Sequence, residues 1–286
     1  MTSPIPIAPQ GPDRGNSITD GHATADGSAR AKADFVRTMF ARIVPRYDLV
    51  NRLMTMGLDR QWRRDTVALV RPSGTVALDI ATGTGDLALE LVRQGARRVI
   101  GADFCHGMLL AAQVKAASCV PGTGTGAMDF VAGDATRLPF HDNTFDCIVN
   151  GFMLRNVTDL AATFAELARV LKPGGRLACL DLTPPRGLGR GLLGFYIGRI
   201  VPLLGGIVSG NYRAYRWLGQ SLRPHPDADA MAALMRAAGL DEVGYRRIGM
   251  GTVAIHQAVK SRSSERLHSS ASPSGERIAD DGRGAA

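Results

Sequence analysis

The stretch "ALDIATGTGDLALEL", residues 77–91, constrains the fold more than any other part of the chain. A short apolar run ends in Gly83-Thr84-Gly85 and continues into a segment with helical spacing. Such turns follow buried parallel strands, where glycines let a ligand approach the backbone and the next helix offers free N–H groups. The stretch therefore predicts a nucleotide or related cofactor site at one edge of a parallel sheet, with a tight turn that holds no ligand as the structural alternative.

Apolar runs and helical segments continue to alternate after this turn. We predict strands at 75–81, 98–104, 128–135, 145–154 and 176–183, and helices at 85–95, 107–118 and 159–171. This rhythm favours right-handed crossovers and a mostly parallel sheet with helices on both faces. A helix at 228–239 and two strands around the turn "GMG" in 242–260 complete the pattern. We expect an α/β fold with seven strands, the last two forming a hairpin and the final one antiparallel to the rest.

Regions of different composition flank this pattern. Residues 31–70 are predicted as an N-terminal helical cap that Pro45 interrupts. Residues 1–30 and 261–286 are predicted as disordered tails, because they lack the apolar periodicity needed to offset the entropy of ordering. These boundaries predict one folded domain over residues 31–260.

The composition excludes several classes of protein. Hydrophobic residues make up 45% and charged residues 21% of the chain, as in soluble globular proteins. Apolar runs fall short of the roughly 18–20 residues that span a bilayer, and the N-terminus lacks the pattern of a secretory signal, so we expect a cytoplasmic protein. The four cysteines form neither a C-x-x-C pair nor a metal-ligand spacing with histidine, which predicts buried thiols and no metal site.

Residues 182–226 break the strand rhythm. The chain carries a net charge of +8, and its basic excess falls on the folded part. This segment has no acidic residue but has apolar and aromatic side chains between six arginines: Arg186, Arg190, Arg199, Arg213, Arg216 and Arg223. Such a segment suits an anionic membrane surface, a lid on its own domain, or the interface of a homodimer. Its aliphatic residues and the lack of a nucleic-acid motif argue against RNA.

The charges around the glycine turn distinguish two classes of cofactor. The turn also fits the loose dinucleotide fingerprint G-x-G-x-x-G/A, and Asp103 after the second strand suits the ribose of either cofactor. Asp79, inside the first strand, is costly to bury unless it is paired. It would pair with the charged amino-acid end of S-adenosylmethionine, whereas Asp79 and Asp86 would both repel a pyrophosphate. The turn therefore favours a cationic cofactor without phosphate.

A second acidic position follows the third predicted strand. In "GDATRLPF", residues 133–140, Asp134 is placed to accept a hydrogen bond from an exocyclic amine, and the apolar residues after it, starting with Ala135, to pack on an adenine. The alternative for Asp134 is a cap of the local turn.

Several motifs together resemble a known family. "LDIATGTGD", "GDATRLPF" and "LARVLKPGGRL" occur in the order of a class I S-adenosylmethionine-dependent methyltransferase. The chain more specifically resembles the ubiquinone/menaquinone biosynthesis C-methyltransferases, from about residue 34 to 260. The stretches that carry this resemblance are "YDLVNRLMTMGLDRQW" (47–62), "FMLRNVTD" (152–159), "RVLKPGGRLACLDLT" (169–183) and "YRWLGQSLRPHPD" (215–227).

The resemblance implies a Rossmann-like methyltransferase fold and transfer of a methyl group from S-adenosylmethionine to a ring carbon of a polyprenylated quinol, in menaquinone or ubiquinone biosynthesis. Another small-molecule or lipid methyltransferase and an NAD(P)-dependent oxidoreductase are the alternatives. Asp59 replaces the family's histidine, and Gly151 stands where a residue with a hydroxyl is frequent. The cofactor contacts expected are Asp79, Gly83, Thr84, Gly85, Asp103, Met108, Asp134, Ala135 and Gly151.

A ring carbon is a poor nucleophile until the adjacent hydroxyl loses its proton, so a base or a cation near that oxygen would raise the rate. Arg155 after the fourth strand is a candidate to stabilise a phenolate, with a surface salt bridge as the alternative. Asp181 and His225 are candidate bases, with a structural acid and an exposed loop histidine as their alternatives.

Three further residues are assigned to the substrate or to packing. Tyr47 and Asn156 are expected to contact the quinol together with Arg155. For Asn156 a helix N-cap before "VTDL" is the favoured alternative. Trp62 is expected to pack within the N-terminal cap.

Overall fold

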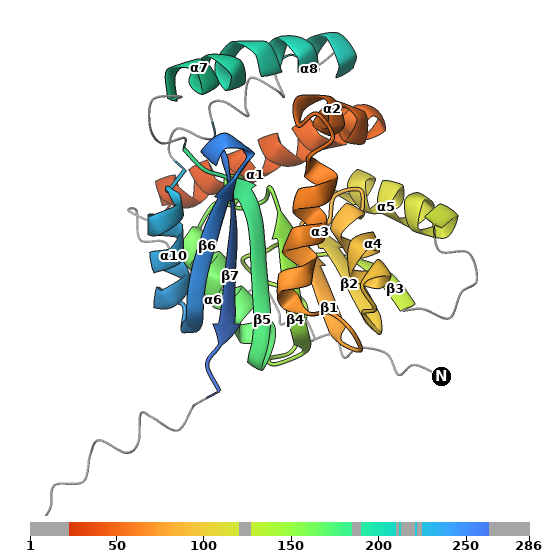
Figure 1. The fold of residues 1–286 in the computed structure, drawn as a ribbon, viewed down its shortest axis with the longest axis vertical. Helices are drawn as coiled ribbons and strands as arrows, with labels where there is room; N and C mark the ends of the chain where they lie inside the picture. Colours follow the sequence, from red (N-terminus) through yellow and green to blue (C-terminus); the bar gives the residue numbers. More distant parts are fainter. Residues whose placement is uncertain are drawn as a thin grey trace, which may run out of the picture.

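The computed structural model describes residues 23–119, 127–184, 190–209, 212, 221 and 225–262. Its centre is one seven-stranded sheet with strand order β3-β2-β1-β4-β5-β7-β6 (Figure 1). The strands are β1 (Val76–Ile80), β2 (Arg98–Asp103), β3 (Ala127–Ala132), β4 (Phe145–Gly151), β5 (Leu171–Leu182), β6 (Leu240–Ile248) and β7 (Val253–Lys260). β1 to β5 pair in parallel, and β7 pairs antiparallel with both β5 and β6. The predicted α/β class, strand number and C-terminal hairpin are confirmed.

Helices cover both faces of the sheet (Figure 1). They are α3 (Asp59–Val70), α4 (Asp86–Arg93) and α5 (His106–Cys119) on one face, and α6 (Leu160–Val170) and α10 (Ala228–Ala237) on the other. Alternate residues of the central strand face opposite layers. Ala77 joins the core with α3 and α4, whereas Leu78 and Ile80 join the core with α6 and α10. A strand buried on both sides reads as a continuous apolar run, which is why β1 could be located from the sequence.

The N-terminal cap lies across the edge of the sheet where the parallel strands end (Figure 1). It consists of α1 (Ala23–Ile43), the 3₁₀ turn η1 (Val44–Arg46) and α2 (Tyr47–Met54), followed by α3. The proline at position 45 lies inside η1, as expected for a residue that cannot continue a helix. The first helix begins at Ala23, ahead of the predicted domain boundary at residue 31.

The segment predicted as a basic, apolar insertion forms helices above the cap (Figure 1). They are α7 (Arg190–Phe195), the π-helix η2 (Tyr196–Ile200) and α8 (Val201–Ser209), and α8 lies against α2. Arg199 has a described side chain, which is exposed. The side chains of the other five arginines named above lie outside the described part of the chain. Within the described residues, no helix combines the length and the apolar character needed to cross a membrane.

Candidate active site

The glycine turn between β1 and α4 has the backbone conformation that its sequence predicts. Gly83 and Gly85 adopt positive φ angles of 55° and 85°, a region that glycine enters without strain. At Gly85 a Cβ atom would also lie 3.2 Å from the Cβ of Ala112 on α5. Asp103 at the end of β2 accepts a hydrogen bond from the Gly83 amide at 2.9 Å. The two strand ends are therefore tied together at the start of α4.

Asp79 lies beneath this turn and is completely buried. Its Oδ2 accepts hydrogen bonds from the Thr82 hydroxyl at 2.6 Å and from the Ala88 amide at 2.9 Å. Its Oδ1 is buried without a hydrogen-bond partner. Burial raises the pKa of this carboxyl to about 7. A buried acceptor without a donor is costly, so this oxygen fits a ligand that brings a positively charged donor.

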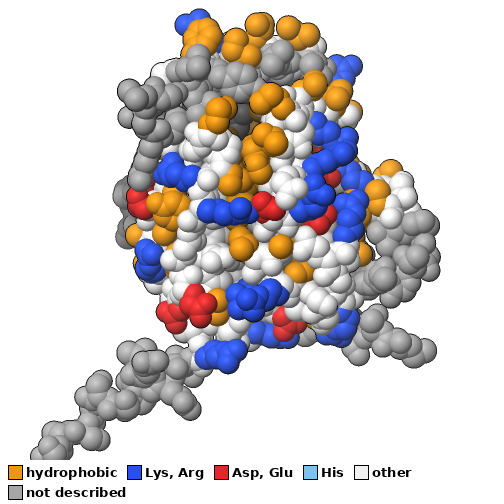
Figure 2. All heavy atoms as spheres, in the orientation of Figure 1, with side chains coloured by type: hydrophobic (Ala, Val, Ile, Leu, Met, Phe, Trp, Pro, Cys, Tyr) orange, Lys and Arg blue, Asp and Glu red, His pale blue; other side chains and the backbone are white. Residues whose placement is uncertain are grey.

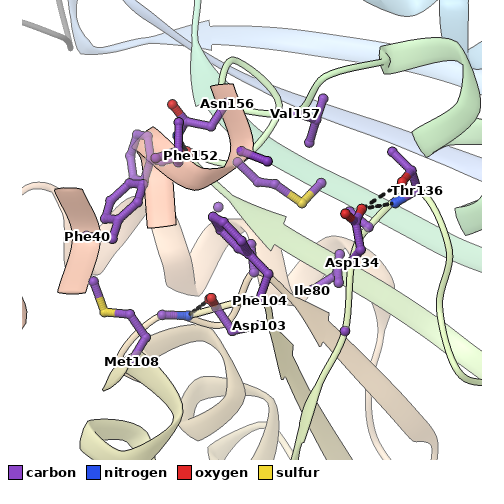
Figure 3. Close-up of a pocket in the computed structure, with 18 of the residues that line it drawn as sticks. Phe40, Ile80, Asp103, Phe104, Met108, Asp134, Thr136, Phe152, Asn156 and Val157 are labelled. Carbon is purple, nitrogen blue, oxygen red and sulfur yellow. Dashed lines mark hydrogen bonds between the residues drawn. The ribbon is translucent and has the colours of Figure 1, made fainter. Parts of the chain in front are cut away.

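A pocket opens beside the turn (Figure 3). Phe40 of α1 and Met108 of α5 approach it from one side, and Asp134 and Thr136 after β3 from the other (Figure 3). Most of the lining is apolar, including Phe104, and its predicted members are Tyr47, Gly83, Asp103, Met108, Asp134, Ala135, Gly151 and Asn156. The pocket lining comes from six segments of the chain, at 33–40, 47, 80–83, 103–108, 133–136 and 151–158, of which the last four lie at the ends of the parallel strands.

The remaining predicted cofactor residues support the turn from behind. Asp79 lies under it, and Gly85 packs on α5. The Thr84 hydroxyl donates to Asp48 of α2 at 2.7 Å and accepts from Lys115 of α5 at 3.0 Å. Thr84 therefore joins the turn to the N-terminal cap.

Asp134 caps its local turn, the alternative considered for it, and it also lines the pocket. Its Oδ1 accepts hydrogen bonds from the amide and the hydroxyl of Thr136, at 2.8 and 2.7 Å (Figure 3). The turn that Asp134 caps holds its exposed carboxylate at the rim of the pocket.

Arg155 and Asp181 form a buried ion pair instead of lining the pocket. The guanidinium of Arg155 donates to Asp181 at 2.9 Å and to the carbonyl of Phe152 at 2.8 Å. Asp181 also accepts hydrogen bonds from the amides of Leu154 and Leu182, both at 2.7 Å. The salt bridge considered for Arg155 exists, but it is internal and not at the surface. The pair fixes the loop after β4, which carries Phe152 and Asn156 to the pocket.

Phe152 is held in an unusual conformation at the pocket wall. Its φ angle is 58°, a region that aromatic residues rarely adopt, and such strain persists only where the surroundings determine it. The guanidinium carbons of Arg155 and of Arg63 on α3 each lie 5.8 Å from the centre of its ring. Two cations therefore flank the one aromatic ring of this loop, within the range of cation–π attraction.

The structure corrects the alternatives considered for His225 and Asn156, and it supports a packing role for Trp62. His225 is buried and not an exposed loop residue, and burial lowers the pKa of its imidazole. Asn156 does not cap the following helix, because the N-cap of α6 is Asp159, which accepts from the Ala162 amide at 2.9 Å. Trp62 has the packing role expected for it, but it packs from α3 against Leu180, Val253 and Ile255 of the sheet and not within the cap.

A charged network that the sequence did not predict fastens the cap to the turn. Lys115 donates to Asp48 at 2.5 Å and to Asp86 at 2.8 Å. Arg63 lies 3.8 Å from Asp86 and forms a buried ion pair with Asp59. Asp59, which replaces a histidine of the family pattern, thus positions Arg63. The members are spread over residues 48–115, and no spacing along the chain relates them.

Phe40, Phe104, Phe152 and Thr136 also line the pocket but were not predicted. Phe104 follows the ribose candidate Asp103 directly, and this adjacency is the signal that could have revealed it. Phe40 had no comparable signal, because its contribution depends on how α1 crosses the sheet edge.

The site suits S-adenosylmethionine better than a dinucleotide. Asp79, Asp86 and Asp103 surround the turn, and the partnerless Oδ1 of Asp79 matches an ammonium group and would repel a phosphate. The same fold occurs in a SAM-dependent methyltransferase of Thermotoga maritima, with a TM-score of 0.56 at 19% identity, over 79% of this chain and 100% of the other. Fold and site define a class I S-adenosylmethionine-dependent methyltransferase.

The chain belongs to the ubiE/COQ5 methyltransferase family, whose model matches residues 28–260. It is 45% identical to a demethylmenaquinone methyltransferase of Roseiflexus sp. (strain RS-1), over 80% of this chain and 94% of the relative. It is 42% identical to a ubiquinone/menaquinone biosynthesis C-methyltransferase of Desulfotalea psychrophila, over 80% of this chain and 92% of the relative. The family resemblance and the cofactor predicted from the sequence are confirmed.

Proposed function

We propose that the protein methylates a ring carbon of a polyprenylated quinol, in the synthesis of menaquinone or ubiquinone. The observation that carries this proposal is a pocket whose lining includes both the cofactor turn at Gly83 and apolar residues of α1 such as Val36 and Phe40. An aromatic ring with an apolar tail requires such a pocket beside the methyl donor. The names of the relatives from Roseiflexus and Desulfotalea support the same substrate class.

On the cofactor side, the chain supplies binding and orientation. Asp103 is placed to accept hydrogen bonds from ribose hydroxyls, and Asp134 from an exocyclic amine. Asp79, which lies under the turn and is not part of the pocket lining, would pair with the ammonium group directly or through water, and Phe104 and Ala135 would pack on the adenine. When bound, the cofactor supplies an activated methyl group, so the remaining task of the protein is alignment of the acceptor carbon.

On the substrate side, two polar side chains stand among the apolar residues of the pocket. Tyr47 and Asn156 line it and are proposed to fix a quinol oxygen. Arg155 is proposed to stabilise the developing phenolate from behind Phe152, and its bond to Asp181 would hold it in place. Asp181 and His225 remain the candidates to move a proton. Burial lowers the pKa of His225 and so favours its neutral form, which is the form that accepts a proton.

The decisive experiment measures transfer of a labelled methyl group to two short-chain quinols, one of the menaquinone and one of the ubiquinone type. Label in either product supports the function, and the ratio assigns the pathway. A protein that binds S-adenosylhomocysteine but labels neither quinol would contradict the proposed substrate class.

The cofactor assignment has its own test. Asp103→Ala should weaken binding of S-adenosylhomocysteine by about 1.5–3 kcal/mol, because the ribose hydroxyls lose a charged acceptor. Calorimetry measures this difference, and Asp129→Ala, at an exposed acid on β3, is the control expected to bind as the wild type does. Equal affinity of the wild type and the Asp103 variant would refute the ribose contact.

We further propose that the protein works in the cytoplasm with peripheral contact to the inner face of an anionic membrane, where a prenylated quinol resides. A homodimer formed through the 182–226 segment is the alternative.

A further inference from the structure

Helix α2 carries two apolar faces, although a helix at the surface of a domain needs one. Its inner face packs on α1 through Val50, with Tyr47 and Met54 partly buried beside it. Its outer face carries Leu49, Arg52 and Leu53 at helical spacing, all exposed, and Met56 is exposed in the turn that follows the helix. We call the exposed set on α2 and the following turn the α2 ridge: Leu49, Arg52, Leu53, Met56, Leu58 and Arg60.

The apolar members of the α2 ridge are unusually exposed for their size. Leu49, Leu53, Met56 and Leu58 are 52%, 50%, 78% and 46% exposed. Single exposed apolar residues are common at protein surfaces, but four within ten positions of the chain form a patch. Such a patch indicates a contact with another apolar surface.

Met56 is held at the tip of this patch by the local backbone. Its φ angle of 52° lies in the left-handed region, which costs free energy for a residue with a side chain. The turn is closed by the Gly57 amide, which donates to the Arg52 carbonyl at 2.8 Å, and by the Leu58 amide, which donates to the Thr55 carbonyl at 3.0 Å. The chain therefore presents the most exposed apolar side chain of the α2 ridge on a fixed turn.

The charges of the segment are sorted between its two sides. Arg52 and Arg60 are exposed beside the apolar residues. The two acidic residues between positions 46 and 60 turn inward, where Asp48 pairs with Lys115 and Asp59 pairs with Arg63. The outer surface of the segment is therefore apolar and basic, which suits an anionic bilayer.

The patch continues onto the neighbouring helix. Leu203 and Ile207 of α8, four positions apart on a helix that contacts α2, are also exposed. Figure 2 shows hydrophobic side chains gathered, with Lys and Arg beside them, at the end of the molecule where Figure 1 places α2, α7 and α8. Tyr47, at the start of α2, lines the pocket, so this end of the molecule also borders the active site.

We propose that the α2 ridge docks the protein on an anionic lipid bilayer, with Met56 entering the headgroup boundary and α8 extending the contact. The proposal rests on the proposed function, because a prenylated quinol would reach the pocket along the same surface. A second copy of the chain is a poorer occupant. A symmetric contact would bring two basic ridges together, while both acidic residues between positions 46 and 60 are already paired within their own chain, so the contact would cost repulsion.

The test compares sedimentation of the full chain with phosphatidylcholine vesicles that contain or lack phosphatidylglycerol, at low and high salt. Leu53→Asp with Met56→Asp should lower partitioning into anionic vesicles by about tenfold or more, since two apolar contacts are replaced by repelled charges. The matched control is Leu110→Asp with Val114→Asp, two exposed apolar residues of α5. This control should partition as the wild type does.

A second variant tests the basic residues of the α2 ridge. Arg52→Gln with Arg60→Gln should reduce the preference for anionic over neutral vesicles and the effect of salt, with the fold left intact. Equal sedimentation of the wild type and both α2 variants would overturn the proposal, and so would an equal loss in the α5 control. If the α2 variants instead convert a dimer to a monomer with unchanged vesicle binding, the α2 ridge is a subunit interface and the proposal is wrong.

Two further measurements separate this proposal from the proposed function. Binding of S-adenosylhomocysteine and methylation of a water-soluble, short-chain quinol should be unchanged in both α2 variants, because neither needs the bilayer. If the wild type methylates this quinol but does not sediment with vesicles, the docking proposal is wrong and the proposed function stands. If the wild type sediments with vesicles but methylates no quinol, the proposed function is wrong and the docking of the α2 ridge stands.

Discussion

Asp79 under the glycine turn is a completely buried acid. Its buried Oδ1 accepts no hydrogen bond, and burial raises its pKa to about 7. An ordinary aspartate in an unfolded chain titrates near 3.9. Because the folded-state value is the higher one, the stability contributed by protonated Asp79 is complete below about pH 4 and is lost as the pH rises through 7. An ammonium group bound against this oxygen would instead favour the ionised form of Asp79.

We therefore expect affinity for S-adenosylhomocysteine to strengthen as the pH rises through 7. Below that value Asp79 must release a proton on binding, so the association constant should fall by up to about tenfold per pH unit. Calorimetry across this range, in buffers that differ in ionisation enthalpy, measures both the affinity and the proton released. The control is Asp79→Asn, for which affinity should be weak and independent of pH. A flat profile in the wild type would contradict the assignment of the ammonium group to Asp79.

Residues of the site were predictable from the sequence where they lie on the turn or directly after a strand, as Gly83 and Asp103 do. There the period of the apolar residues shows where a strand ends, and parallel strand ends share one edge of the sheet. The internal ion pair of Arg155 with Asp181 was not predictable. It joins the loop after β4 to the end of β5. Asp181 lies in a predicted apolar strand, but no signal along the chain pairs it with Arg155, 26 positions away.

At the scale of elements, the N-terminal cap is held to the sheet by charge as well as by packing. Lys115 of α5 binds Asp48 of α2 and Asp86 of α4, so a single ammonium group joins three helices. Burial alone would raise the pKa of Asp86, but Arg63 and Lys115 bring it below its usual value. The strands and helices of the sheet followed from their periodicity, whereas this network depends on tertiary contacts between separate helices.

Lys115→Met should lower the free energy of unfolding by about 1–2 kcal/mol, because two partly buried carboxylates lose their shared cation. Urea denaturation measures the change. The matched control is Lys172→Met, which removes one ion pair of a more exposed lysine with Asp146 and should cost less than about 1 kcal/mol. Equal losses in the two variants would show that Lys115 acts as an ordinary surface lysine.

At the scale of the whole molecule, ligand binding should appear as thermal stabilisation, because the pocket joins the sheet edge to α1 and α2. S-adenosylhomocysteine at about 100 times its dissociation constant contributes about 2.7 kcal/mol, or a rise in Tm of about 5–10 °C for a domain of this size. NADH at the same concentration should leave Tm unchanged, since the described lining of the pocket holds no Lys or Arg that could bind its phosphates. Differential scanning calorimetry measures both, and a larger rise with NADH would contradict the choice of cofactor.

The strand order also determines when the sheet can be completed during synthesis. β1 to β5 can pair as they leave the ribosome, since each lies beside a strand made earlier or soon after. β6 pairs with β7 alone, and β7, made after it, must enter between β5 and β6. Until residue 260 has emerged, β5 has an open edge and β6 has no strand to pair with. The nascent chain therefore exposes a sheet edge of the kind that recruits chaperones or aggregates, and loss of the last strand would detach two strands from the sheet.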